Sequence, residues 1–199
     1  MKRLLLIMSL LITSISAVTA QTEKGRWTVG VSVGNFQYSS QNNYHSFSGS
    51  LSPSAGYFFA KNLVVGTGLP LSLSTNKYQS IKASNSGIGL SPFVRYYFGD
   101  AKLKPYVGLS YAYSKTWQRN TGGGQDYKGE GYTSSLSPSV GLAYFINNNV
   151  ALNAGLGYVH SRFKSASGYF DVTGQPIDSP ASTSNYFSLG IGFQIFFGK

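Results

Sequence analysis

The sequence predicts an all-β protein, an eight-stranded antiparallel up-and-down transmembrane β-barrel. Eight stretches alternate between apolar and small side chains, which is the two-residue period of a β-strand. Only 11% of the residues are charged, and no carboxylate falls within these stretches, although a soluble domain carries roughly 25% charged residues. The connections between the stretches alternate between short and long, as they do in membrane barrels.

The first twenty residues are predicted to be a secretory signal peptide. Lys2 and Arg3 precede a short apolar run over residues 4–15, and Val18 and Ala20 occupy the positions that a signal peptidase reads. The run is too short for a transmembrane helix. We therefore expect cleavage after Ala20, a barrel domain over residues 21–199, and a net charge that falls from +10 to +8. The absence of cysteine excludes disulfides and thiol chemistry.

The strands follow one another with the same two-residue period. In the second strand every odd position from Phe47 to Phe59 except Gly49 is apolar, and the even positions from Ser48 to Gly56 are Ser or Gly. The first strand changes phase before Phe36, which predicts a β-bulge near Asn35. The predicted strands cover residues 27–38, 47–59, 63–73, 88–98, 107–113, 136–144, 150–158 and 187–197.

The composition of the two faces decides between a soluble and a membrane barrel. A soluble lipocalin-like barrel alternates too, but its polar face meets water and should carry Lys, Glu and Asp. Here the polar face is Ser, Gly and Ala, which suits the narrow interior of an eight-stranded barrel. The apolar face is therefore predicted to contact lipid. Near mid-bilayer we expect Leu69, Leu109, Val140 and Ile191, and as a partial plug of the lumen Arg95, Phe93, Tyr97 and Tyr106.

A Leu-Ser-Pro motif occurs three times, with Pro53, Pro92 and Pro138 inside the second, fourth and sixth strands. Proline cannot donate a ladder hydrogen bond and normally lies at a sheet edge or a bulge. Because a closed barrel has no edge, each proline should mark a bulge or an opened rung. The repeat indicates a repeated hairpin unit rather than a binding motif.

The connections predict the orientation of the barrel. Those at residues 61–62, 99–104 and 147–149 are short and should be periplasmic turns. Those at residues 39–45, 76–85, 118–131 and 161–185 are longer and should be outer loops. Aromatic residues gather at both ends of the strands, as at the two interfaces of a membrane. They are Tyr57, Phe59, Tyr96, Phe98, Tyr144 and Phe197 at the turn side, and Tyr113, Trp117, Tyr158 and Phe187 at the loop side.

From Trp27 to the C-terminus, this pattern resembles the bacterial outer membrane β-barrel domain family, the small barrels of the OmpA and OmpX kind. The last strand, Tyr186 to Phe197, is similar to the family's assembly signal of alternating apolar residues that ends in an aromatic. Gly198 and Lys199 follow that aromatic and depart from the pattern. The resemblance implies export through the periplasm, the bacterial outer membrane as location, and the outer membrane assembly machinery as a partner.

Basic residues on the outer side indicate a non-enzymatic structural or surface-interaction role. Lys115, Arg119, Arg162 and Lys164 are predicted to lie at the height of the lipopolysaccharide phosphates and to contact them. Solvated loop charges with no specific partner are the alternative explanation. The predicted location argues against a nucleic-acid partner, and the sequence predicts neither a catalytic site nor a cofactor or metal site.

Two other functions stay open at this level. The first is a narrow, porin-like passage for small solutes, since rows of Ser and Gly leave room for water in the lumen. The second, less favoured, is a lipid A acyl hydrolase, because the resemblance includes barrel enzymes with a His and a Ser two positions apart. His160 with Ser161, and His45 with Ser46, are adjacent instead, so the two side chains of each pair should point to opposite faces. The sequence leaves the oligomeric state open.

Overall fold

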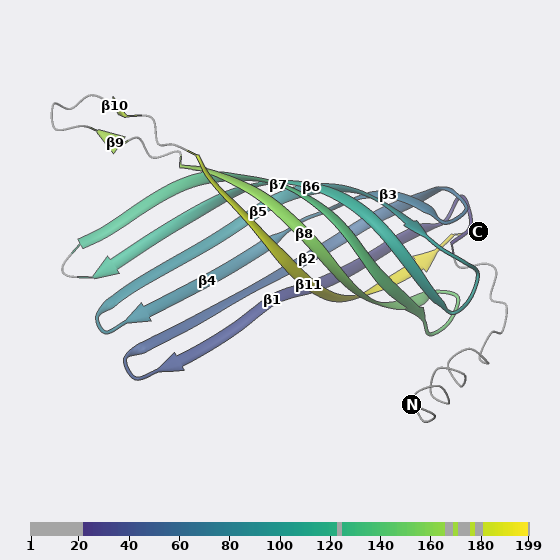
Figure 1. The fold of residues 1–199 in the computed structure, drawn as a ribbon, viewed down its shortest axis with the longest axis horizontal. Coiled ribbons are helices and arrows are strands. Elements are labelled where there is room, and N and C mark those ends of the chain that lie inside the picture. Colours follow the sequence, from purple (N-terminus) through teal and green to yellow (C-terminus); the bar gives the residue numbers. More distant parts are fainter. Residues whose placement is uncertain (1–21, 123–124, 166–168, 171–175, 178–180, 199) are drawn as a thin grey trace.

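The computed structural model of the chain describes residues 22–122, 125–165, 169–170, 176–177 and 181–198 (Figure 1). The predicted signal peptide lies outside the described residues. The strands are β1 (Trp27–Gln41), β2 (Tyr44–Ala60), β3 (Leu63–Gly68), β4 (Leu71–Tyr78), β5 (Ile81–Tyr97), β6 (Leu103–Gly122), β7 (Gln125–Phe145), β8 (Val150–Ser165), β9 (Tyr169–Phe170), β10 (Pro176–Ile177) and β11 (Ser182–Phe197). Within the described residues, no helix has the length and hydropathy needed to cross a bilayer.

Eight antiparallel strands close into a ring. β3 and β4 lie end to end and act as one strand, since both pair with β2 on one side and β5 on the other. The ring then continues through β6, β7, β8 and β11, and β1 closes it by pairing with both β11 and β2. The predicted up-and-down barrel is confirmed. β9 and β10 form a separate two-stranded sheet between β8 and β11.

The apolar residues of each strand point outward. Leu69, Leu109, Val140 and Ile191 are all exposed on the outer surface, so the predicted direction of this face is confirmed. The alternate positions of the same strands face the lumen and are mostly small, except for large side chains near the short turns. The result is an apolar outer wall around a narrow interior, the reverse of a soluble barrel.

Each Ser-Pro pair opens the ladder to the strand that follows it. In each case two residues, the Ser and the Pro, are left without a partner on the following strand. In β2 the pairs on either side of this gap are Leu51–Leu71 and Ser54–Gly68. In β5 they are Leu90–Tyr113 and Phe93–Ser110, and in β7 they are Leu136–His160 and Ser139–Gly157. The register is the same on both sides of each gap, so the prolines mark opened rungs rather than bulges. The predicted bulge near Asn35 is also present, as a register shift between Gly34 and Gln37 in the pairing with β2.

The two ends of the barrel differ. The short turns and the C-terminal end of β11 lie at one end, which we name the turn end, and the long hairpins extend past the other, the hairpin end (Figure 1). Residues 39–45, 76–85 and 118–131, predicted as outer loops, are instead mostly strand, because the strands continue into paired hairpins there. β1 and β2 pair as far as Gln41–Tyr44, and β4 and β5 as far as Tyr78–Ile81. Asn42 and Gln79 take positive φ angles of 46° and 51° in the two tight turns.

Candidate functional site: the lumen and the rim

Aromatic side chains pack the lumen in the half nearest the turn end. Phe58, Tyr97, Phe145 and Phe196 are fully buried, and so is Val64. The ring centroids of Phe58 lie 6.1 Å from Tyr97 and 6.0 Å from Phe196, and those of Phe145 and Phe196 are 5.0 Å apart. These side chains come from β2, β3, β5, β7 and β11, so they tie opposite walls of the barrel together.

Of the four side chains predicted for the lumen, Tyr97 belongs to this packed layer, and Arg95, Phe93 and Tyr106 lie next to it. The Arg95 guanidinium lies 4.3 Å from the ring centroid of Tyr106 and 5.8 Å from that of Phe93. It donates a hydrogen bond to the Tyr97 hydroxyl (3.2 Å), which in turn donates to Gln194 (2.9 Å). Among the described residues Arg95 forms no ion pair, so cation–π contacts and this hydroxyl stabilise its charge in the lumen.

A polar cluster that sequence reasoning missed closes the turn end. Thr22 precedes β1, is almost fully buried, and donates a short hydrogen bond to Asn62. The fully buried Lys104 donates to the Thr22 hydroxyl (2.9 Å), and its ammonium lies 5.4 Å from the Phe145 ring centroid. The Thr22 carbonyl also accepts from the Asn62 amide (2.7 Å). The segment just before β1 therefore covers the mouth of the barrel.

Arg26 fixes the same segment to two other elements. Its guanidinium donates to the carbonyl oxygens of Asn148 (3.0 Å) and Phe196 (3.1 Å). Burial lowers the pKa of Arg26 from its ordinary value, although an arginine stays charged at any physiological pH. The start of β1, the β7–β8 turn and the end of β11 are thus held together by one side chain.

The lumen opens into a polar cavity of about 350 Å³ toward the hairpin end. Residues with hydroxyl groups make up most of the wall, together with glycines and Val33, Pro70 and Ala112, and none of them is charged. Its hydroxyl groups belong to Ser32, Ser50, Ser52, Ser72, Ser114, Thr116, Thr133, Ser135, Ser161, Tyr186 and Ser188. A cavity of this size and polarity holds several waters. We call it the vestibule.

Ion pairs join the two strands of the β6–β7 hairpin at the rim. The Lys115 ammonium lies 2.7 Å from Glu130, and Arg119 makes two hydrogen bonds to Asp126, of 2.7 and 3.0 Å. The Arg119 guanidinium holds the pKa of Asp126 below its usual range. Two of the four cations predicted to contact lipopolysaccharide are therefore already paired within the protein.

Arg162 and Lys164 lie elsewhere on the rim. They are exposed on the outward face of β8, beyond the aromatic residues Tyr158 and Phe187, whose ring centroids are 5.5 Å apart. Lys164 stands opposite Tyr132, which stacks on Tyr113 at 5.8 Å. Neither cation forms an ion pair with any residue that the structure describes. Unpaired cations directly above an aromatic belt are placed to meet anionic headgroups.

The two histidines do not form nucleophile–base pairs with their neighbours in sequence. Ser161 is buried and points to the face opposite His160, whose Nδ1 lies 2.7 Å from the Asn185 amide oxygen. His45 contacts the Ser40 hydroxyl (3.0 Å) at the exposed tip of the β1–β2 hairpin. Neither histidine has a hydrogen bond to a carboxylate among the described residues, and those residues contain no His/Asp/Glu group that could hold a metal ion.

An apolar outer wall, aromatic residues at both ends and a small polar lumen define a transmembrane β-barrel. The family model of the outer membrane protein beta-barrel domain matches residues 5–174. The chain therefore belongs to the outer membrane β-barrel family, and it is a bacterial outer membrane protein. A comparison with curated proteins found no match.

Solved structures of small outer membrane barrels share this fold. The chain is 22% identical to Neisserial surface protein A (NspA), with 86% of this chain and 99% of that chain covered and a TM-score of 0.52. Ail of Yersinia pestis is 12% identical, with 87% of this chain and 99% of that chain covered and a TM-score of 0.53. OprG of Pseudomonas aeruginosa is 14% identical, with 90% of this chain and 99% of that chain covered and a TM-score of 0.51. Identities this low establish the fold alone.

Proposed function

We propose that this protein is a non-enzymatic envelope barrel whose rim binds lipopolysaccharide through Arg162 and Lys164. The hairpin end faces outside, as the longer connections of outer membrane barrels do. The observation that carries the proposal is the position of these two exposed cations, which lie directly above Tyr158 and Phe187 and outside the ion pairs of the β6–β7 hairpin. Lipid A phosphates are fixed anions at that height, and charge-assisted hydrogen bonds to them are favourable.

The paired cations Lys115 and Arg119 contribute less to this surface. Each would have to break its ion pair with a carboxylate before it could bind a phosphate. The carboxylates of Glu130 and Asp126 would also repel the phosphate. The binding surface therefore centres on β8 and its neighbours rather than on all four of the cations that sequence reasoning selected. Assembly into the membrane through the last strand is proposed on the family's pattern alone.

The proposal is tested by neutralising the two pairs of cations separately. We expect Arg162→Gln with Lys164→Gln to weaken lipopolysaccharide association by about tenfold or more at low salt, because two charge-assisted contacts are lost. The difference from the wild type should shrink as salt rises. The measurement is titration of the folded protein in lipid nanodiscs with purified lipopolysaccharide.

Lys115→Gln with Arg119→Gln is the matched control, since it removes the same charge from the same rim. It should weaken binding clearly less than the β8 double variant. An equal loss of affinity in both double variants would mean that only the net charge of the rim matters. No loss of affinity in the β8 variant would refute the proposed contact.

A passage for small solutes is not supported by the packing of the lumen. The vestibule is open toward the hairpin end, but Tyr97, Phe58, Phe145 and Phe196 fill the interior below it, and Thr22 and Lys104 close the turn end. Close packing of this kind opposes the passage of water. It therefore supports a closed lumen rather than a channel.

We expect the wild-type barrel to give no steady conductance in a planar bilayer. Phe58→Ala, Tyr97→Ala and Phe196→Ala combined with Lys104→Ala should introduce a measurable current, since these side chains fill the lumen and close the turn end. Tyr111→Ala, on the lipid-facing side of β6, is the control and should stay silent. A stable current through the folded wild type would instead favour the channel function.

A further inference from the structure

One seam of the barrel stays open at the hairpin end. β1 and β11 pair over only eight residue pairs, from Trp27–Phe197 to Gly34–Gly190. Beyond that point β1 pairs with β2 and β11 with β8, and Figure 1 shows β1 and β11 diverging. The next seam, between β8 and β11, extends over fourteen pairs, and β6 and β7 pair up to the last described residues of their hairpin.

The bulge after Gly34 explains why the seam ends there. An extra residue in one strand bends it and increases its twist, and in β1 this happens directly after the last pair with β11. From Phe36 onward β1 leaves the direction of β11 while it remains in register with β2. The outer part of the barrel is consequently an open sheet with two edges, which we call the β1 edge (residues 36–41) and the β11 edge (residues 182–189).

The two edges carry the most exposed apolar side chains of the described protein. On the edges these are Tyr38 (73%), Phe187 (72%), Leu189 (67%) and Phe36 (64%). Ile191 (62%), the next in exposure, lies on β11 in the closed part of the seam, opposite Val33. Lipid covers such residues within the bilayer, but Phe36 and Tyr38 lie beyond the closed part of β1. A concentrated apolar surface there indicates an interface.

Neither edge carries the features that protect a strand from pairing with another chain. Natural edge strands use lysine, other charges or proline for this purpose, yet the segments Phe-Gln-Tyr-Ser-Ser-Gln and Ser-Thr-Ser-Asn-Tyr-Phe-Ser-Leu contain none of them. Other hairpins of the same rim are charged, through Lys77, Lys82, Arg119, Lys128 and Lys164 among others. The open seam is thus the neutral side of a basic rim.

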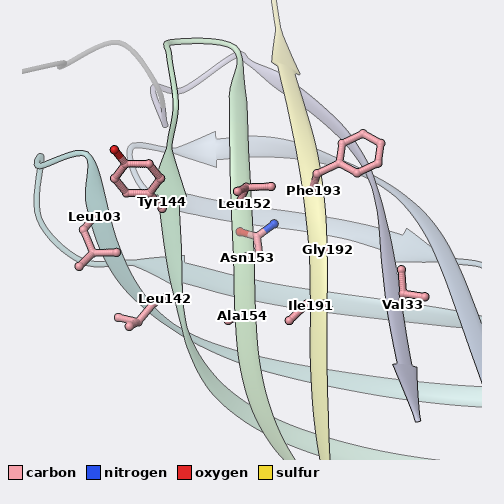
Figure 2. A pocket seen from close by; sticks show the side chains of 10 residues that line it. All are labelled: Val33, Leu103, Leu142, Tyr144, Leu152, Asn153, Ala154, Ile191, Gly192 and Phe193. Atoms are coloured by element: carbon pink, nitrogen blue, oxygen red, sulfur yellow. The ribbon is translucent and has the colours of Figure 1, made fainter. Parts of the chain in front are cut away.

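An apolar groove of about 470 Å³ lies next to the closed part of the same seam. Figure 2 shows it on the outer wall, where Ala154 and Gly192 lie among the larger side chains Leu152, Ile191 and Phe193. Val33 of β1 completes it on the far side of the seam. The groove continues the apolar surface of the two edges toward the turn end.

We propose that the open seam binds a second copy of this chain and forms a two-fold symmetric dimer. A rotation about the membrane normal brings two seams face to face, so that each β1 edge meets the β11 edge of the other copy. β1 and β11 then run antiparallel, as they already do within one chain from Trp27 to Gly34. The edges are therefore complementary in direction and in hydrogen bonding.

The pattern and charge of the two edges favour a second copy of this chain over other partners. An added strand must have apolar side chains on its outer face and small polar ones over the vestibule, which is the pattern of this chain's own strands. It must also approach a basic rim, and the neutral edges let two basic copies meet without like-charge contact. The apolar wall of the second copy then lies against the groove below the seam.

Cysteine cross-linking tests the proposal directly, because the chain contains no cysteine. Gln37→Cys and Ser188→Cys are made in two differently tagged full-length chains, which are expressed together and oxidised in the membrane. We expect a disulfide between the two tags. Tyr78→Cys with Ile81→Cys, on the closed β4–β5 hairpin, is the control pair and should give none.

A chain that carries both Gln37→Cys and Ser188→Cys separates the dimer from a seam that closes on itself. The dimer predicts product at twice the mass of one chain, whereas a bond within one chain would overturn the proposal. Tyr38→Lys with Phe187→Lys should convert the wild-type dimer to monomer in native mass spectrometry of membrane extracts. A monomeric wild type, with or without bound lipid at the seam, would also overturn it.

Discussion

Leu109→Arg is expected to lower the free energy of unfolding in lipid by about 2–4 kcal/mol, the cost of a cation near the middle of a bilayer. Leu109 points outward from β6, between Val94 of β5 and Pro138 of β7. Its closest outward neighbours along β6 are Val107 and Tyr111, both exposed on the apolar wall. An arginine at this position has no carboxylate beside it among the described residues. Its guanidinium must either displace lipid or extend toward the membrane–water interface.

Ser110→Asn is the matched control, one residue along the same strand. Ser110 faces the lumen, opposite Phe93 of β5 and Ser137 of β7, so a polar amide there does not enter lipid. Denaturant unfolding of both variants in lipid vesicles measures the difference. If Leu109→Arg were as stable as Ser110→Asn, the assignment of the lipid face would be reversed.

The barrel was predictable because its main determinant is local. Alternation along a single strand sets the two faces, and the opened rungs at Pro53, Pro92 and Pro138 follow from the missing amide hydrogen of proline. The outer hairpins were not predictable in the same way. Beyond the membrane both faces meet water, so residues 39–45 and 76–85 lose the alternation while the backbone continues to pair.

Contacts between residues far apart in the sequence could not be predicted either. Lys104 and Thr22 are 82 positions apart, and nothing in either neighbourhood indicates that a lysine is buried under the segment before β1. The pairing of Arg119 with Asp126 required the register of the β6–β7 hairpin, which places Asn120 opposite Tyr127 and brings the two side chains onto one face. Arg95 could be singled out because it is the one charged residue in the strand predicted over residues 88–98.

The space around the lumenal glycines also depends on these distant contacts, and Gly66 of β3 gives the second large effect. A methyl group at Gly66 would meet the backbone of β2 at the Ala55 carbonyl and, at 2.7 Å, the Gly56 Cα. It would also meet the edge of the Phe93 ring at 2.7 Å. Two of these three atoms belong to a strand that is paired on both sides, so they cannot move independently.

Gly66→Ala should therefore destabilise the barrel by about 1–3 kcal/mol, the usual cost of overpacking a filled interior. Gly157→Ala is the control, because the nearest atom to its added methyl group is the Pro138 carbonyl oxygen at 3.6 Å, an ordinary contact. Both residues lie in strands and face the lumen, so the two variants lose the same backbone freedom and differ only in the room available. Unfolding in lipid vesicles compares them, and equal stability would mean that the walls around Phe93 can separate without cost.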